Sequence, residues 1–207
     1  MMAVLWYIHD PMCSWCWAFR PVWDALRRQL PDAVEVKYLL GGLAPDSDAP
    51  MSAATQAMIR RHWQTIEKRV PGSRFNDDFW TLCSPRRSTY PACRAVIAAA
   101  KQNPSLEDAM ILSIQQAYYL QARNPSDDDV LIELASTLSL DSGRFRTDLN
   151  SAETQAELLS EIHTSRNMGV TGFPALVLEV NGLYRHIRID YNDAAVMLQQ
   201  LTAGQEL

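Results

Sequence analysis

The chain has 207 residues, which suits one domain with a large insertion or two small domains. Apolar residues make up 47% of it, enough for a packed core, and the net charge is −5. This acidic balance lacks the clustered basic face of nucleic-acid-binding proteins, so we expect no nucleic-acid partner. No apolar run approaches the length of a membrane span, and no basic leader with a long apolar stretch precedes the first predicted strand. We therefore expect a cytoplasmic protein with no membrane partner.

A pair of cysteines follows the first predicted strand. The apolar run at residues 4–8 stops at a proline turn, and Cys13 and Cys16 then open an amphipathic segment over residues 14–30. This pattern predicts a strand, a turn and a helix. Positions three apart on a helix have Cα atoms about 5 Å apart, which lies within the range that a disulfide spans. The pair can therefore form and break a disulfide without a backbone movement.

The two cysteines are expected to have different roles. Cys13, at the start of the helix, faces unpaired backbone N–H groups and the positive end of the helix dipole, which favour the thiolate. We predict that it is the nucleophile. Cys16 lies one turn further in and is predicted to be the resolving thiol, which attacks a mixed disulfide formed on Cys13. Half of a zinc site and a structural disulfide are the alternatives for such a pair.

The remaining elements are predicted from periodicity and turn signals. Residues 34–40 alternate, become apolar and end at two glycines, which predicts a second strand parallel to the first. Residues 44–50 form a linker rich in Pro and Asp. Helices are then expected at about 51–69, 77–83 and 89–101, from 105, from 126, and at 151–168. Strands at 175–180 and 183–189 flank an Asn-Gly hairpin signal, and a last helix is expected at 192–202.

The resulting order is β-α-β, a helical insertion, then α-β-β-α. This order, the CxxC motif after the first strand and the Gly-Val-Thr-Gly-Phe-Pro segment at 169–174 resemble the DsbA family of thioredoxin-fold oxidoreductases over the whole chain. The Cys-Ser-Trp-Cys segment and the Pro-Ala-Cys-Arg-Ala segment at 91–95 are most similar to its intracellular FrnE-like branch. That branch, of predicted protein-disulfide isomerases, borders the 2-hydroxychromene-2-carboxylate isomerases. The resemblance implies an α/β thioredoxin-like fold with a large inserted α-helical subdomain.

The domain boundaries follow from this order. Residues 1–50 and 166–207 are expected to form a discontinuous thioredoxin-like domain, and residues 51–165 a helical insertion subdomain. The insertion's helices carry more apolar stripes than a small thioredoxin core can bury. We therefore predict that the insertion folds as a unit over the CxxC face.

The resemblance also assigns roles to individual residues. It implies that Cys13 is an exposed nucleophile, that Pro174 is cis and that Phe173 presents its backbone beside the CxxC motif, where an extended peptide could add as a short strand. The alternative is that Phe173 and Pro174 only end a loop. Trp15 is expected to be exposed and to contact an apolar substrate. The family's periplasmic oxidant has His at that position, so the resemblance implies that this protein is a weaker oxidant.

Four further residues are ambiguous in the sequence. His9 and Asp10 precede the motif and are candidates for proton transfer with Cys16, although surface polar residues at a strand end are the alternative that we favour. Cys83 and Cys93 are expected to be partly buried structural thiols, with a second redox pair as the alternative.

The leading functional hypothesis is a thiol-disulfide oxidoreductase or protein-disulfide isomerase that works through a mixed disulfide and needs no metal or organic cofactor. Its partners would be proteins or small molecules containing thiols or disulfides, and an unidentified redox partner. The second hypothesis is a transferase or isomerase with glutathione as co-substrate, against which Cys16 argues because such relatives use no resolving thiol. The third, a zinc module formed by all four cysteines, is disfavoured because Cys83 and Cys93 are too far apart in sequence.

Overall fold

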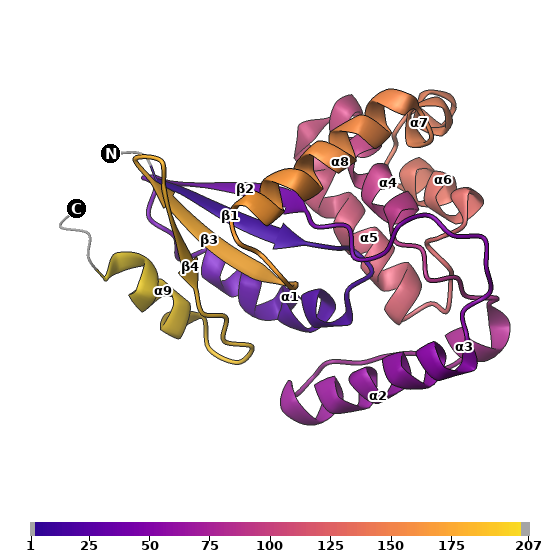
Figure 1. The fold of residues 1–207 in the computed structure, drawn as a ribbon, viewed down its shortest axis with the longest axis horizontal. Helices are drawn as coiled ribbons and strands as arrows, with labels where there is room; N and C mark the ends of the chain where they lie inside the picture. Colours follow the sequence, from indigo (N-terminus) through magenta and orange to yellow (C-terminus); the bar gives the residue numbers. More distant parts are fainter. Residues whose placement is uncertain (1–2, 204–207) are drawn as a thin grey trace.

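The computed structural model describes residues 3–203, which form a four-stranded mixed sheet with helices on both faces and a helical insertion (Figure 1). The strands are β1 (Ala3–His9), β2 (Val34–Leu40), β3 (Ala175–Val180) and β4 (Leu183–Ile187), in the spatial order β2-β1-β3-β4. β2 is parallel to β1, whereas β3 is antiparallel to both β1 and β4. β1 is therefore a central strand, and its carboxyl end leads directly to the cysteine pair.

Helices α1 (Ser14–Arg27) and α9 (Ala194–Thr202) cover one face of the sheet. Their apolar side chains pack with Leu5 and Tyr7 of β1 and with Leu176 and Leu178 of β3. On the other face, Ile8 and Val177 pack against the segment that follows α8 (Ala152–Asn167). The end of β1 is thus buried on both faces, which fixes the position of the loop that carries the cysteines.

Residues between β2 and β3 form the insertion, and its long segments are helical (Figure 1). Before α8 it contains α2 (Ala53–Arg69), α3 (Phe79–Leu82), α4 (Tyr90–Gln102), a 3₁₀ turn (Pro104–Leu106), α5 (Glu107–Tyr119), α6 (Asp128–Thr137) and α7 (Ser142–Leu149). α4 is buried along residues 91–99, where four alanines let neighbouring helices approach closely. The insertion therefore has a core of its own, with α4 at its centre.

The structure differs from the predicted elements at several places. No helix was predicted at α7, because only Phe145 and Leu149 are buried on it and two positions make no recognisable stripe. The helix predicted to begin at residue 105 is preceded by a 3₁₀ turn capped by Asn103. α1 ends at residue 27 instead of 30, and β4 ends at 187 instead of 189. The predicted domain boundary after residue 165 falls inside α8.

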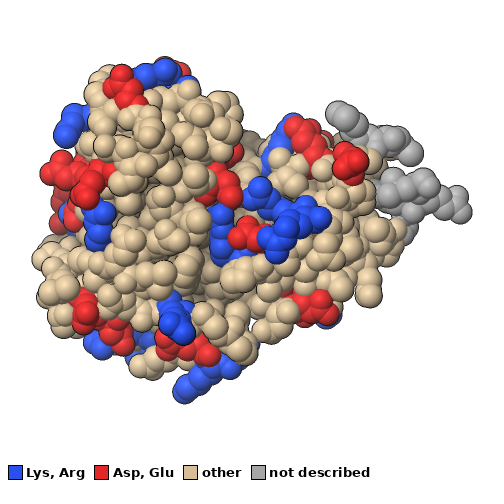
Figure 2. Space-filling view, turned by 180° about the vertical axis from the view of Figure 1, so that it is seen from behind, with Lys and Arg blue, Asp and Glu red and all other residues tan. Residues whose placement is uncertain are grey.

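The predicted hairpin is present, and both of its turn residues have left-handed backbone conformations, with φ of 53° at Asn181 and 76° at Gly182. On the face shown in Figure 2, basic and acidic side chains are interspersed instead of forming a field of one sign. Within residues 3–203, no helix has the length and apolar character needed to cross a bilayer.

Candidate active site

Cys13 lies at the N-terminal end of α1, where its carbonyl accepts the helix's first backbone hydrogen bond, from Trp17 N. The residue is only 7% exposed, and Cys16, one turn further along, is fully buried. The expectation of an exposed nucleophile is therefore wrong, because the insertion covers the motif and leaves Cys13 in the wall of a cavity. Both residues are free thiols in this structure.

The environments of the two thiols separate their pKa values. A hydrogen bond from the Cys16 thiol lowers the pKa of Cys13, helped by the backbone N–H groups of Cys16 and Trp15 and opposed by burial. Burial raises the pKa of Cys16 well above its ordinary value, and the shared hydrogen bond acts in the same direction. Cys13 is thus the thiol that ionises first, which is the property that a nucleophile needs.

The loop before β3 closes the site from the opposite side. The Phe173–Pro174 peptide bond is cis, and the Phe173 carbonyl lies 3.5 Å from Cys13 Sγ. The Phe173 ring packs against Gly41 so closely that a Cβ atom there would lie 2.0 Å from the ring carbons. Sequence reasoning used Gly41 only as a strand-end signal, because the residue that it contacts is more than a hundred positions away.

Asp10 is fully buried, so the expectation that it lies at the surface is wrong. Its carboxylate accepts hydrogen bonds from Met12 N at 2.8 Å, from Leu43 N at 2.7 Å and from Thr89 Oγ1 at 2.7 Å. The Cys93 thiol is a weaker fourth donor at 3.6 Å. Burial raises the pKa of Asp10, and these hydrogen bonds oppose that change. The carboxylate therefore links the cysteine loop to the loop after β2 and to the start of α4.

His9 is also fully buried, again contrary to the surface expectation. Its ring stacks on Tyr7 with centroids 5.0 Å apart and meets the edge of Tyr38 at 5.7 Å. Neither ring nitrogen has a hydrogen-bond partner within the described part of the chain. Burial, with a smaller effect of Arg20, lowers the pKa of His9 to about 3, so its imidazole is neutral near pH 7.

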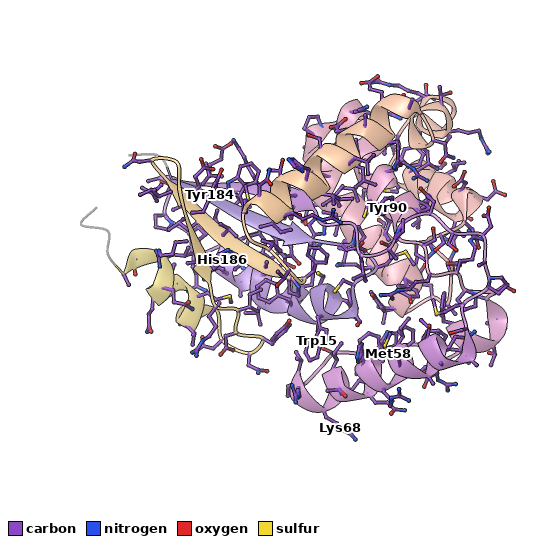
Figure 3. The ribbon with its side chains drawn as sticks, in the orientation of Figure 1. Trp15, Met58, Lys68, Tyr90, Tyr184 and His186 are labelled. Atoms are coloured by element: carbon purple, nitrogen blue, oxygen red, sulfur yellow. The ribbon has the colours of Figure 1, made fainter. Side chains whose placement is uncertain are left out.

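Trp15 is half-buried instead of exposed, because its ring packs edge-on against Tyr191 at 5.0 Å. It separates two hollows. One is a cavity of about 200 Å³ that contains Cys13 and extends to α2, where Met58 lies near Trp15 (Figure 3). The other is an open groove of about 600 Å³ between Trp15, Phe173 and Tyr191. Both hollows are available to a substrate that reaches Cys13.

The insertion supplies cavity residues that sequence reasoning did not find. They are apolar side chains of α2 and its flanking residues together with a basic pair before α4, namely Met51, Met58, Ile59, Trp63, Arg86 and Arg87. No local pattern marks them, because methionine and tryptophan stripes on a helix are typical of a core. Only the packing of α2 beside α1 gives them access to Cys13.

Cys83 and Cys93 are free thiols, half-buried and fully buried respectively. Cys83 Sγ donates to the Ala122 carbonyl at 3.1 Å, and burial raises the pKa of both thiols. Their structural role stays a prediction. Across residues 3–203, no group of three or more His, Cys, Asp or Glu side chains could hold a metal ion.

A cysteine pair at the start of the first helix, beside a cis-proline loop at the same end of a mixed sheet, defines a thioredoxin-fold dithiol protein. Residues 6–190 match the family model described as thioredoxin, and the chain belongs to that family. The predicted thioredoxin-like α/β fold with a helical insertion is confirmed, and so is its place with the DsbA-like proteins.

Several solved structures are similar to the chain. A candidate protein disulfide isomerase from Nitrosomonas europaea has 30% identity and a TM-score of 0.85, covering 97% of this chain and 96% of that one. The cytosolic disulfide reductase DsbM from Pseudomonas aeruginosa has 25% identity and a TM-score of 0.75, covering 89% of each. DsbA from the same organism, at 13% identity and a TM-score of 0.56, shows the fold alone. These two relatives, at 25% identity or more, are thus described as a disulfide isomerase and a disulfide reductase.

The curated relatives have a different name. The ClpXP adapter protein SpxH of Halalkalibacterium halodurans is 25% identical over 171 residues, and that of Bacillus subtilis is 24% identical over 171 residues. The alignments cover 81% of this chain but 56% and 55% of those proteins. The chain therefore spans about half the length of the curated relatives that it matches.

Proposed function

We propose that this protein is a cytoplasmic thiol-disulfide oxidoreductase that reduces or isomerises disulfides through a mixed disulfide on Cys13. The observation that carries this proposal is the environment of Cys13 Sγ. The sulfur lies at a helix N-terminus, receives a hydrogen bond from Cys16 and is 3.5 Å from the carbonyl of Phe173. The helix N-terminus and the Cys16 hydrogen bond favour a thiolate, and the Phe173 carbonyl marks the place where an extended substrate would meet the cis-proline loop.

The reaction has two exchange steps. The Cys13 thiolate attacks one sulfur of a substrate disulfide, the substrate S–S bond breaks, and the other half leaves as a thiolate. Cys16 then loses its proton and attacks the Cys13 sulfur, which releases the second half as a thiolate and leaves a Cys13–Cys16 disulfide. A dithiol protein or two molecules of a thiol such as glutathione return the pair to the reduced form. No metal or organic cofactor takes part.

Asp10 is the better candidate for the proton acceptor of Cys16. Its carboxylate is close enough to raise the pKa of both motif thiols, and its own pKa is raised by burial, which makes it a stronger base than an exposed aspartate. His9, with a pKa of about 3, is a weak base at neutral pH. We therefore assign proton transfer to Asp10 and a packing role to His9.

The electrostatics favour reduction over oxidation of clients. The Asp10 carboxylate disfavours thiolates at the motif, and Trp15 offers only an indole N–H where a cation would stabilise the thiolate. A less stable reduced form gives a more reducing couple. The similarity to a cytosolic disulfide reductase supports the same direction and the same compartment.

Trapping tests the proposal. Cys16→Ala should accumulate mixed disulfides that a reducing agent dissolves, because the resolving attack is missing, whereas Cys13→Ala should capture nothing. Normal turnover by Cys16→Ala, or trapping by Cys13→Ala, would show that the roles assigned here are wrong.

The alternative function is a glutathione-dependent transferase or isomerase. A structure of DsbM with glutathione is among the similar structures, so this alternative needs a test of its own. A Cys13–glutathione adduct that persists in the wild-type protein, seen by mass spectrometry, favours that alternative.

A further inference from the structure

The cavity beside Cys13 has an unusual charge for this chain. The sequence has 24 acidic and 19 basic residues, yet the side chains lining this cavity include Arg86, Arg87 and His62 and no Asp or Glu. Asp10 lies behind the wall, where Leu43 and Thr89 hydrogen-bond it. The N-terminus of α1 adds its positive dipole end at the same place. An anion entering the cavity therefore meets basic side chains on its lining, while the buried Asp10 carboxylate behind the wall acts against them.

The two arginines differ in how they are paired. Arg86 Nη2 forms an ion pair with Asp127 at 2.8 Å and also donates to the Ser126 carbonyl, so the charge of this guanidinium is already balanced by a carboxylate. Arg87 is half-buried and has no hydrogen bond or ion pair to any residue from 3 to 203. Its guanidinium carries five N–H donors, and none of its nitrogens is among the buried side-chain atoms that lack a partner, so these donors are open to solvent and available to an anion. Arg87 is therefore the free cation of this cavity within the described residues.

The rest of the wall sets the size and character of the ligand. Apolar side chains, including Met58, Ile59 and Trp63, form the side contributed by α2. A volume of about 200 Å³ is small, about the space of six or seven water molecules in the liquid. It holds a few non-hydrogen atoms on either side of a sulfur, and a folded segment does not fit.

From these observations we propose that Arg87 is a specificity-determining residue that selects small disulfides with a carboxylate or similar anion a few bonds from the reacting sulfur. This inference rests on the proposed attack of Cys13 on a disulfide. Arg87 binds the anion by charge-assisted hydrogen bonds while the apolar wall packs on the short carbon chain. Cys13 then attacks the nearer sulfur, the S–S bond breaks, and the distal half leaves as a thiolate.

The test compares three small disulfides with similar chains and different charges. These are 3,3′-dithiodipropionate, which is anionic, bis(2-hydroxyethyl) disulfide, which is neutral, and cystamine, which is cationic. Wild-type protein should reduce them with kcat/KM falling in that order. Arg87→Gln should lower the ratio of anionic to neutral substrate about tenfold, since one charge-assisted contact at a half-exposed site is lost. Any change that the substitution makes in Cys13 reactivity affects all three substrates and cancels in the ratio.

Matched variants complete the experiment. Arg61→Gln removes an exposed arginine of α2 that does not line the cavity, and the ratio should stay at its wild-type value. Arg87→Lys should restore part of the preference. Added salt should weaken the preference in wild type and leave Arg87→Gln little changed.

The outcomes distinguish a failure of this inference from a failure of the proposed function on which it rests. Equal kcat/KM for the three disulfides in wild type, or an unchanged ratio in Arg87→Gln, overturns the role of Arg87 while the dithiol mechanism stands. If Cys16→Ala forms no mixed disulfide with any substrate, the proposed function itself is overturned. Peptide disulfides with Asp or Lys beside the half-cystine form a second arm. A charge preference seen with peptides and not with small disulfides shows that the anion belongs to a protein client and overturns the small-substrate proposal.

Discussion

The Asp10 carboxylate places negative charge close to both sulfur atoms of the motif. It raises the pKa of Cys13 and of Cys16, while the hydrogen bond between the two thiols lowers the pKa of Cys13 by a larger amount. The nucleophile is thus the result of opposing contributions. Burying a carboxylate is unfavourable. Because four hydrogen-bond donors hold the Asp10 carboxylate in its buried position, we infer that its charge has a role at the cysteine pair.

Replacing this charge should shift the redox equilibrium. Asp10→Asn is expected to lower the pKa of Cys13 and to raise the reduction potential, because the reduced thiolate form becomes more stable, with about 30 mV for each 1.4 kcal/mol. The thiolate absorbance against pH and equilibration with a glutathione redox buffer measure the two effects. Asp24→Asn is the control, because Asp24 is a carboxylate of α1 that pairs with Arg20 and not with the cysteines. A potential that falls in Asp10→Asn contradicts the assignment.

Gly41 controls the position of Phe173. Gly41→Ala should displace the Phe173 ring, because the new Cβ would lie 2.0 Å from it, and should lower kcat/KM while destabilising the fold by about 1–3 kcal/mol. Phe173→Leu in the same chain should recover part of the stability. Gly172→Ala, in the loop that carries Phe173, is the matched control, since no atom lies within 4 Å of its added Cβ. Activity and urea unfolding report both effects, and equal behaviour of the two alanine variants would refute the steric role.

At the scale of elements, α8 protects an edge of the sheet. β2 is an edge strand, and the N–H of Leu40 at its end donates to Glu161 Oε2 on α8 at 2.6 Å. This contact satisfies a backbone group that would otherwise be open to pairing with another chain. Burial raises the pKa of Glu161 to about 7.

This pKa makes stability depend on pH. The folded protein holds the Glu161 proton more tightly than the unfolded chain, whose ordinary pKa is 4.5, so the stabilisation is present below that value and is lost as the pH rises through about 7. Between about pH 5 and pH 8, wild type should lose on the order of 2 kcal/mol more than Glu161→Gln. Glu153→Gln, on the same helix and not among the groups that shift the pKa of Glu161, is the control. Parallel pH profiles for wild type and Glu161→Gln would contradict this expectation.

The elements that the sequence predicted well are those with strong local signals. β2 and β3 were predicted at their observed bounds, because their apolar alternation and flanking glycines are local properties. The helix over residues 151–168 was predicted within a residue at each end, since Ser151 caps it and Gly169 follows with φ of 77°. α7 was missed because it has two buried positions, and its start is marked only by the Asp141 cap. Short elements that depend on tertiary packing give no periodic signal.

At the scale of the molecule, the insertion and the sheet meet at the cysteine loop. Thr89, at the start of α4, donates to Asp10 and accepts from Ala44 N at 3.0 Å. A second link, 2.8 Å long, joins Arg20 of α1 to Asp108 of α5. The motif could be predicted from sequence, because the cysteine pair and the proline loop each follow a recognisable position in the order of elements. The cavity could not be predicted, because Arg87 and Met58 reach Cys13 only through contacts between distant segments.

Breaking the first link should weaken the whole molecule. Thr89→Val keeps the shape but removes one donor from the buried Asp10, and it should lower the free energy of unfolding by about 1–3 kcal/mol. Tryptophan fluorescence and circular dichroism should still report one transition, since both parts share this link. Thr137→Val, whose hydroxyl bonds only within its own helix, should have little effect. Two separate transitions in the wild-type protein would show that the insertion and the sheet unfold independently.

The nearly complete burial of Cys13 also affects how far peroxide can oxidise the cysteine pair. A sulfenic acid formed on Cys13 lies in contact with the Cys16 thiol, which can condense with it to give the disulfide and water. A second oxidant molecule must instead reach the sulfur of a residue that is only 7% exposed. Condensation is therefore faster than further oxidation, and the motif stops at a state that an ordinary thiol reverses. Irreversible sulfinic acid should appear first where Cys16 has been replaced.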